Sequence, residues 1–150
     1  MIAIDTGVWI EYINTNGLLH PEAKAVIDLV ENGETEAVLT QLTLTEIYYV
    51  ALMVYNEVYS THESGKRAKQ LYDFIYLHPH IEIKPLDYEL CLGAGIIKSK
   101  YNIAFSDCFL LALSEKEDST VLFKSMENEM KQNIKELKKK FNLKFLEEYS

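Results

Sequence analysis

Residues 1–10, MIAIDTGVWI, combine a short apolar run, an acid and the start of a helical pattern. Ile2 to Ile4 is the kind of run that forms a fully buried strand, and Asp5 follows it directly. Apolar side chains then recur at helical spacing between residues 8 and 13. The sequence therefore predicts a carboxylate at the C-terminal end of an interior strand.

The same alternation continues outward from this segment. Further strands are expected at residues 37–40, 81–83 and 120–123, with an edge strand at 143–146. Helices are expected at residues 21–33, 42–58, 66–77, 87–100, 107–114 and 127–140, with a loop at 62–65. Short strands alternating with helices predict an α/β fold, a three-layer α/β/α sandwich around a mostly parallel sheet of four or five strands. No linker or repeat divides residues 1–150, so one domain is expected.

Local signals refine these expected elements. Ala25, Val26, Leu29 and Val30 are expected on one buried stripe of the helix that starts at Pro21. Thr43 or Thr45 could cap the helix over 42–58, and Ser106 the helix that starts at Asp107. Cys91 and Cys108 lack metal-ligand spacing and are expected to be reduced and buried.

Composition and charge exclude several classes of protein. Hydrophobic residues make up 48% and charged residues 25% of the 150 residues, as in ordinary globular proteins. No basic leader or membrane-length apolar run is present, so a cytoplasmic protein is expected. Fifteen Lys and Arg against 23 Asp and Glu give a net charge of −8, which argues against binding nucleic acid through bulk positive charge. Carboxylates that hold divalent cations would nevertheless present positive charge to phosphates.

Three acids stand isolated in apolar sequence. Asp5 ends a strand, Glu46 lies in an apolar helix, and Asp107 lies in the first turn of another. Each has a structural alternative, helix capping for the two aspartates and a solvated helix face for the glutamate. Together they could share one cleft, because the carboxyl ends of parallel strands and the following helix starts meet at one edge. Such oxygen ligands select Mg²⁺ or Mn²⁺, and phosphodiester hydrolysis is the reaction that this site predicts.

Three segments in this order resemble the landmark segments of PIN domains: IAIDTGVWIEYI, TLTEIYYV and NIAFSDCFLLALS. The resemblance spans most of the chain. PIN domains, which include the toxins of VapBC-type toxin–antitoxin pairs, are α/β/α sandwiches that cleave RNA with Mg²⁺ or Mn²⁺ held by three or four acids. The resemblance implies that Asp5, Glu46 and Asp107 are catalytic, metal-binding acids.

The fourth acid of the family has no plain counterpart. Where the family often has a Thr-Gly-Asp-like segment after the strand TVLF, this chain has KSMENEM. Alignment of the acidic tail makes Glu127 the best substitute, as a catalytic and metal-binding residue, and Glu129 the next metal ligand. Strict spacing from the strand would place Ser125 there instead. Thr6 and Ser106 match hydroxyl residues of the family beside the first and third acids, and either could cap a helix or orient a metal-bound water.

Other charged and aromatic groups have two interpretations each. KELKKK, residues 135–140, is either a solvated helix end or a contact for an RNA backbone. Arg67, with Lys66 and Lys69, could touch phosphates or an acidic partner. The tyrosines between residues 48 and 76 are expected in the core or in a dimer interface rather than as base-stacking platforms. The apolar and tyrosine-rich content of the helices between Leu42 and Tyr76 exceeds what one small core requires, so self-association, as a homodimer, is expected.

The function that these observations favour is a divalent-cation-dependent endoribonuclease, the toxin half of a type II toxin–antitoxin pair, with an antitoxin protein as partner. The toxin role rests on the resemblance alone. Two alternatives stay open: an RNA-processing PIN nuclease without an antitoxin, and a catalytically degenerate PIN-like module that binds RNA or protein.

Overall fold

The computed structural model describes all residues, Met1–Ser150, and contains one five-stranded sheet in the order β3-β2-β1-β4-β5. The strands are β1 (Ile2–Ile4), β2 (Ala37–Thr40), β3 (Ile81–Lys84), β4 (Thr120–Phe123) and β5 (Leu143–Phe145). All four neighbouring pairs are parallel. The predicted α/β class is confirmed, and the sheet has five strands, all parallel.

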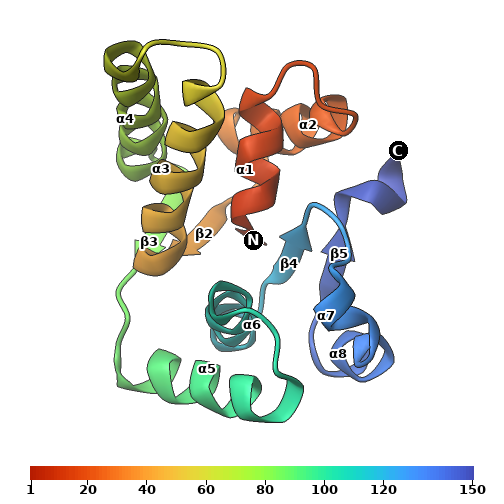
Figure 1. Cartoon of the computed structure of the whole chain (residues 1–150). Coiled ribbons are helices and arrows are strands. Elements are labelled where there is room, and N and C mark those ends of the chain that lie inside the picture. The colour runs from red at the N-terminus through yellow and green to blue at the C-terminus, as the bar shows by residue number, and fades with distance from the viewer.

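Helices flank the sheet, as Figure 1 shows. They are α1 (Thr6–Ile13), α2 (His20–Glu31), α3 (Gln41–Asn56), α4 (Thr61–Leu77), α5 (Tyr88–Tyr101), α6 (Phe105–Glu117), α7 (Asn128–Lys131), α8 (Ile134–Lys140) and the 3₁₀ helix η1 (Leu146–Tyr149). Helices α3 and α4 form a hairpin, and α5 packs against α6. None of the helices is both long and apolar enough to cross a lipid bilayer.

Two hydrophobic clusters, one on each face of the sheet, account for the layers. Successive residues of a strand point to opposite faces, and Ala3 accordingly belongs to the cluster with α5, α6 and α8 whereas Ile4 belongs to the cluster with α1 to α4. Val121 and Leu122 of β4 divide in the same way. Strands buried on both faces require the continuous apolar runs seen in the sequence.

Two helix starts differ from the expectation. Ser60 caps α4 by accepting a hydrogen bond from the backbone N–H of Glu63, so the helix begins before Gly65 and the predicted loop at 62–65 was wrong. Thr40, the last residue of β2, caps α3 by accepting from the N–H of Thr43. The predicted capping roles of Thr43 and Thr45 were therefore wrong, because the strand passes into the helix without a loop.

Helix α6 and the C-terminal region also differ from the expectation. Ala104 precedes α6, and Ser106 lies inside its first turn, so Ser106 is not the cap. The single charged helix expected over 127–140 is divided into α7 and α8. Asn133 lies between them, outside helical geometry, and its side-chain amide donates to the carbonyl of Tyr101.

Burial corrects two further expectations. The buried stripe of α2 consists of Ala23, Ile27 and Val30, whereas Ala25 and Leu29, expected on the stripe, are exposed. The buried stripe differs from the expected one because α2 packs against α1 and η1, contacts that the local sequence does not encode. Cys108 is buried as expected, but Cys91 is exposed on α5, a helix that packs mainly on α6.

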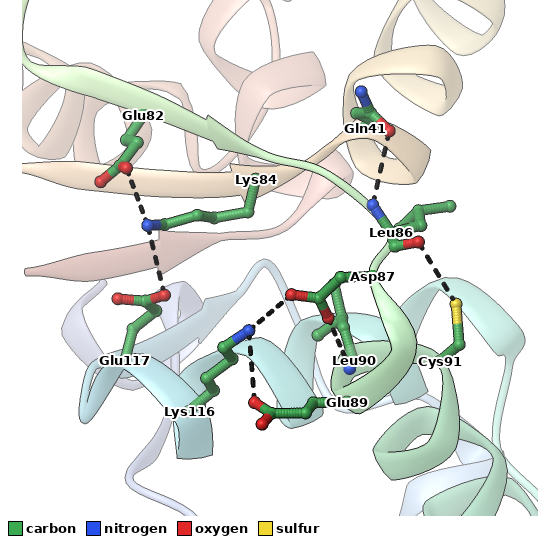
Figure 2. A network of polar contacts seen from close by, with 10 residues as sticks. All are labelled: Gln41, Glu82, Lys84, Leu86, Asp87, Glu89, Leu90, Cys91, Lys116 and Glu117. Carbon is green, nitrogen blue, oxygen red and sulfur yellow. Dashed lines mark hydrogen bonds and ion pairs between the residues drawn. The ribbon is translucent and has the colours of Figure 1, made fainter.

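A polar network joins the β3–α5 connection to the rest of the molecule (Figure 2). The Lys116 ammonium of α6 pairs with Asp87 at 2.7 Å, and this contact lowers the pKa of the Asp87 carboxyl. Asp87 also caps α5 by accepting from the N–H of Leu90. Lys84 at the end of β3 pairs with Glu117 of α6 at 3.4 Å. The network thereby fixes the start of α5 against α6, whose first turn carries Asp107.

Candidate acidic active site

Asp5 lies at the carboxyl end of the central strand, as the sequence predicts. Its backbone N–H donates to the carbonyl of Leu122 at 3.0 Å, which holds it at the end of β1. Its carboxylate accepts from the N–H of Gly7 at 3.0 Å and caps α1. Burial, together with the nearby charges of Glu46 and Glu127, raises the pKa of Asp5 to about 7. The carboxylate therefore has the capping role and also lies among other acids.

Gly7 provides the space that this arrangement needs. A Cβ at position 7 would lie 3.1 Å from Cβ of Lys124 and 3.2 Å from Oδ2 of Asp5. Both contacts are tighter than ordinary van der Waals packing, and one of them is to an atom of the candidate site. A side chain at residue 7 would push the Asp5 carboxylate or the end of β4 out of place.

Glu46 is held from α1 by a hydrogen bond. The buried Thr6 hydroxyl donates to Oε1 of Glu46 at 2.5 Å, across forty residues of sequence. Glu46 lies in the second turn of α3 and is partly buried. Thr6 is therefore no helix cap, because Asp5 occupies that position; its partner is the second acid.

Asp107 lies in the first turn of α6 and is 5% exposed. Its Oδ2 atom is buried and has no hydrogen-bond partner. Burial and the charges of Asp5, then Glu127 and Glu46, raise the pKa of Asp107 to about 8. An unpartnered buried carboxylate oxygen is costly, and a cation is the partner that would offset this cost.

The segment after β4 brings two more acids near the cluster. Glu127 and Glu129 are exposed. Partial desolvation raises the pKa of Glu127, and the negative charges of Glu129 and Glu46 raise it further. The charge of Glu129 also contributes to the raised pKa of Asp107. Ser125, the alternative from strict spacing, is partly buried between β4 and α7.

The donor chemistry of these residues fits a hard divalent cation. Every donor is a carboxylate oxygen, and the acids raise one another's pKa, which is the behaviour of a cluster that a cation would stabilise. In this structure no three His, Cys, Asp or Glu side chains lie close enough together to coordinate one metal ion. The predicted ligand roles of Asp5, Glu46, Asp107, Glu127 and Glu129 stay predictions.

An ion pair beside the cluster was missed from the sequence. Lys124, directly after β4, pairs with Oε2 of Glu11 at 2.9 Å, and Glu11 is 3% exposed. Burial raises the pKa of Glu11, but Lys124 and the N–H of Leu19 outweigh it and lower the pKa overall. Glu11 stands between apolar Ile10 and Tyr12, the same signal that singled out Glu46.

The chain is an α/β protein with a parallel sheet and a group of electrostatically coupled acids beyond the carboxyl end of its central strand. The chain belongs to the PIN domain family, whose model matches residues 2–132. PIN domains are typically nucleases. No curated protein matches the chain.

Solved structures with the same fold include toxins and toxin–antitoxin complexes. VapC20 of Mycobacterium tuberculosis, a Sarcin-Ricin loop cleaving toxin, has a TM-score of 0.65 at 16% identity, over 88% of this chain and 94% of that chain. VapBC2 of Rickettsia felis, bound to a DNA fragment from its promoter, has a TM-score of 0.63 at 12% identity, over 95% and 97%. FitAcB of Neisseria gonorrhoeae has a TM-score of 0.59 at 20% identity, over 83% and 88%. At these identities the likeness shows the fold.

Proposed function

We propose that this chain is a divalent-cation-dependent endoribonuclease and the toxin component of a type II toxin–antitoxin pair, with residues 1–150 acting as one PIN domain. The observation that carries the enzymatic part is the buried, unpartnered Oδ2 of Asp107, whose carboxyl interacts electrostatically with Asp5 and Glu46. A protein retains such an unfavourable cluster where a cation has to be bound.

Asp5, Glu46 and Asp107 would hold the ion, Mg²⁺ or Mn²⁺, with Glu127 and then Glu129 as the additional acids. When bound, such an ion polarises a phosphate and lowers the pKa of an attacking water. The residues of the chain supply position: the N–H of Gly7 fixes the Asp5 carboxylate, and the Thr6 hydroxyl fixes that of Glu46. The absence of a side chain at Gly7 lets Lys124 pack closely beside the Asp5 carboxylate.

The toxin role is supported by the proteins whose structures resemble this one. VapC20 is a toxin, and a structure from Klebsiella pneumoniae with a TM-score of 0.60 at 12% identity is a toxin–antitoxin complex. The partner would be an antitoxin protein with a segment that covers these acids. An adjacent gene for a small DNA-binding protein, whose product co-purifies with this chain and blocks RNA cleavage, would support the toxin; cleavage without any such partner would favour RNA processing instead.

The test of the enzymatic proposal is single-turnover cleavage of a structured RNA with Mg²⁺, Mn²⁺ or chelator. Asp5→Asn and Asp107→Asn should each abolish cleavage, because the amide keeps the shape and loses the charge that holds the ion. Glu127→Gln should reduce cleavage less, since Glu127 is more exposed than Asp107. Asp118→Asn is the matched control, an exposed aspartate in the left-handed conformation that asparagine also adopts. Cleavage that persists in chelator or in both aspartate variants would refute the proposal.

A further inference from the structure

A groove between α3 and α4 lies outside the acid cluster and is not used by the proposed reaction. Two adjoining hollows of about 400 and about 460 Å³ share Tyr48 and Lys69. They are lined by Thr45, Tyr48, Thr61, His62, Gly65, Lys66, Lys69, Tyr72 and Asp73. We call this surface the α3–α4 groove.

Aromatic rings line one side of the α3–α4 groove. The rings of Tyr48 and Tyr72 meet at 89° with centroids 6.4 Å apart, and Tyr72 stacks on Tyr76 at 10° and 6.2 Å. Tyr48 is 36% and Tyr76 57% exposed, and Tyr72, which contacts both rings, is partly buried against the hydrophobic core. Every nucleobase has a π face, and a base that stacks on an exposed tyrosine contributes to binding whatever its sequence.

Basic side chains line the other side. His62, Lys66 and Lys69 are exposed and recur at intervals of four and three residues, so they share one face of α4. Lys66 has no ion-pair partner, and Lys69 pairs only with Asp73, at 2.6 Å. The groove carries two lysines and one carboxylate, so it is locally positive although the whole chain has a net charge of −8. Phosphates complement that charge.

The groove is open and starts at the second turn of α3. A Cβ at Gly65 would meet no atom within 4 Å, so the glycine leaves free space inside the groove. Glycine inside a helix costs about 1 kcal/mol relative to alanine, and α4 tolerates it here. Thr45 at one end of the groove and Glu46 both lie in the second turn of α3, but Thr45 faces α4 whereas Glu46 accepts a hydrogen bond from Thr6 of α1. An RNA strand bound at the acid cluster would therefore cross over the start of α3 to reach the groove.

We propose that the α3–α4 groove binds single-stranded RNA, with a base stacked on Tyr48 and Tyr72 and phosphates held by Lys66 and Lys69. The choice of RNA as ligand rests on the proposed function, and the groove extends the contact with that substrate beyond the site of cleavage. This proposal differs from the expectation from the sequence, which placed these tyrosines in the core or in a dimer interface.

The test measures binding in chelator, where no metal-dependent cleavage occurs. A fluorescent oligoribonucleotide of about twelve nucleotides, a length typical of single-strand binding sites, is titrated with the full-length chain. Tyr48→Leu should weaken binding about tenfold, because it removes the ring and keeps a side chain of similar burial. Tyr149→Leu, which changes an exposed tyrosine in η1 outside the groove, should bind as the wild type does.

The lysines are tested through the salt dependence of the dissociation constant. Lys66→Gln and Lys69→Gln should each lower the slope of log K against log salt by about 0.7, the value for one phosphate contact in a single strand. Lys24→Gln is the matched control for Lys69, because Lys24 pairs with Asp28 at 2.6 Å and the same i,i+4 spacing on α2. Its slope should not change.

The two proposals fail in different ways. Failure of the proposed function appears as absence of metal-dependent cleavage, which the binding assay does not use. If the Tyr48 and lysine variants bind RNA with the affinity and salt slope of the wild type, the groove proposal is overturned. The same holds if these variants lose the binding of a protein partner but keep that of RNA. Should Tyr48→Leu not fold, the lysine variants decide the question, since they replace exposed side chains.

Discussion

At the scale of single residues, the hydrogen bond from Thr6 to Glu46 ties the first acid segment to the second. A residue that orients a metal-binding acid acts through that acid, so its loss should weaken metal binding more than folding. Asp5, one residue earlier, keeps its own capping bond without Thr6. Thr6 is thus a positioning residue whose contribution can be measured separately.

Thr6→Val should raise the Mn²⁺ concentration required for half-maximal RNA cleavage by about tenfold or more, because valine keeps the shape and cannot hold the Glu46 carboxylate. The free energy of unfolding should fall by only about 1 kcal/mol. Thr6→Ser retains the hydroxyl and should restore most of the metal response. Equal metal responses of the valine and serine variants would contradict the positioning role.

The raised pKa values of Asp5 and Asp107 predict how stability depends on pH without divalent ions. Their pKa values of about 7 and about 8 exceed the ordinary value of 3.8, so between these limits the folded state binds more protons than the unfolded state. The contribution of these two carboxyls to the free energy of unfolding should therefore be greatest below about pH 3.8 and fall as the pH rises from there toward 8. Urea unfolding at a series of pH values, in chelator, measures this slope.

Asp107→Asn removes one titrating group and should flatten that slope and stabilise the metal-free protein at pH 8 by on the order of 1 kcal/mol. Asp118→Asn should keep the wild-type slope, since Asp118 is exposed at the end of α6. A wild-type stability that does not change between about pH 5 and about pH 8 would show that the acids are less crowded than their pKa values indicate.

Asp5, Glu46 and Asp107 could be singled out from the sequence because each is a charged residue in an apolar segment, where a charge needs a partner. The hydrogen-bond and ion-pair partners around the site could not be predicted from the sequence. The contact of Thr6 with Glu46 spans forty residues, and that of Glu11 with Lys124 joins α1 to the end of β4. Such contacts depend on tertiary packing, which local spacing does not encode.

At the scale of elements, interior strands were predictable and helix ends were not. The run Ala37 to Thr40 is typical of an interior strand, because all four residues are buried and neither face of the strand meets water. Gly65 looks like a loop residue, yet α4 runs through it because Ser60 caps the helix and the Glu63–Arg67 ion pair spans the glycine. Residue type alone did not distinguish a helical glycine from a loop glycine.

Helix α5 contains two glycines that should respond differently to substitution. A Cβ at Gly95 meets no atom within 4 Å, whereas a Cβ at Gly93 would lie 3.4 Å from Cβ of Ala112. Gly95→Ala should raise the free energy of unfolding by about 1 kcal/mol through helix propensity and reduced freedom of the unfolded chain. Gly93→Ala should gain less, because its Cβ would lie against Cβ of Ala112 at the lower limit of ordinary van der Waals contact. Urea denaturation compares the two, and equal gains would contradict this account.

At the scale of the whole molecule, the alternation of strands and helices predicted the sheet and its helical layers, but the strand order β3-β2-β1-β4-β5 was not readable. Right-handed crossovers allow several orders for strands of similar composition. The observed order places β1 at the centre, with β2 and β4 on either side. Asp5 is therefore central among the carboxyl ends of the strands, within the electrostatic reach of acids from α3, α6 and the segment after β4.

The exposed apolar residues predict that two copies of the chain associate. The sequence placed this surface within residues 42–76, and Tyr49 and Met53 of α3 are indeed 61% and 52% exposed. The longer stripe lies on α5, where Tyr88, Leu92 and Ile96 recur every fourth residue and are 81%, 52% and 53% exposed. A continuous apolar helix face facing water is unfavourable, and a second copy would cover it.

Leu92→Glu should therefore convert a dimer at micromolar concentration into a monomer, because a charge in the middle of the α5 stripe cannot be buried without a partner. The unfolding of the isolated chain should change little, since Leu92 is half exposed. Leu18→Glu, at a residue that is 96% exposed and outside the stripe, is the control and should leave the mass unchanged. Sedimentation equilibrium gives the masses. Dissociation by Met53→Glu but not by Leu92→Glu would place the interface on α3, as the sequence suggested, and a monomeric wild-type protein would refute self-association altogether.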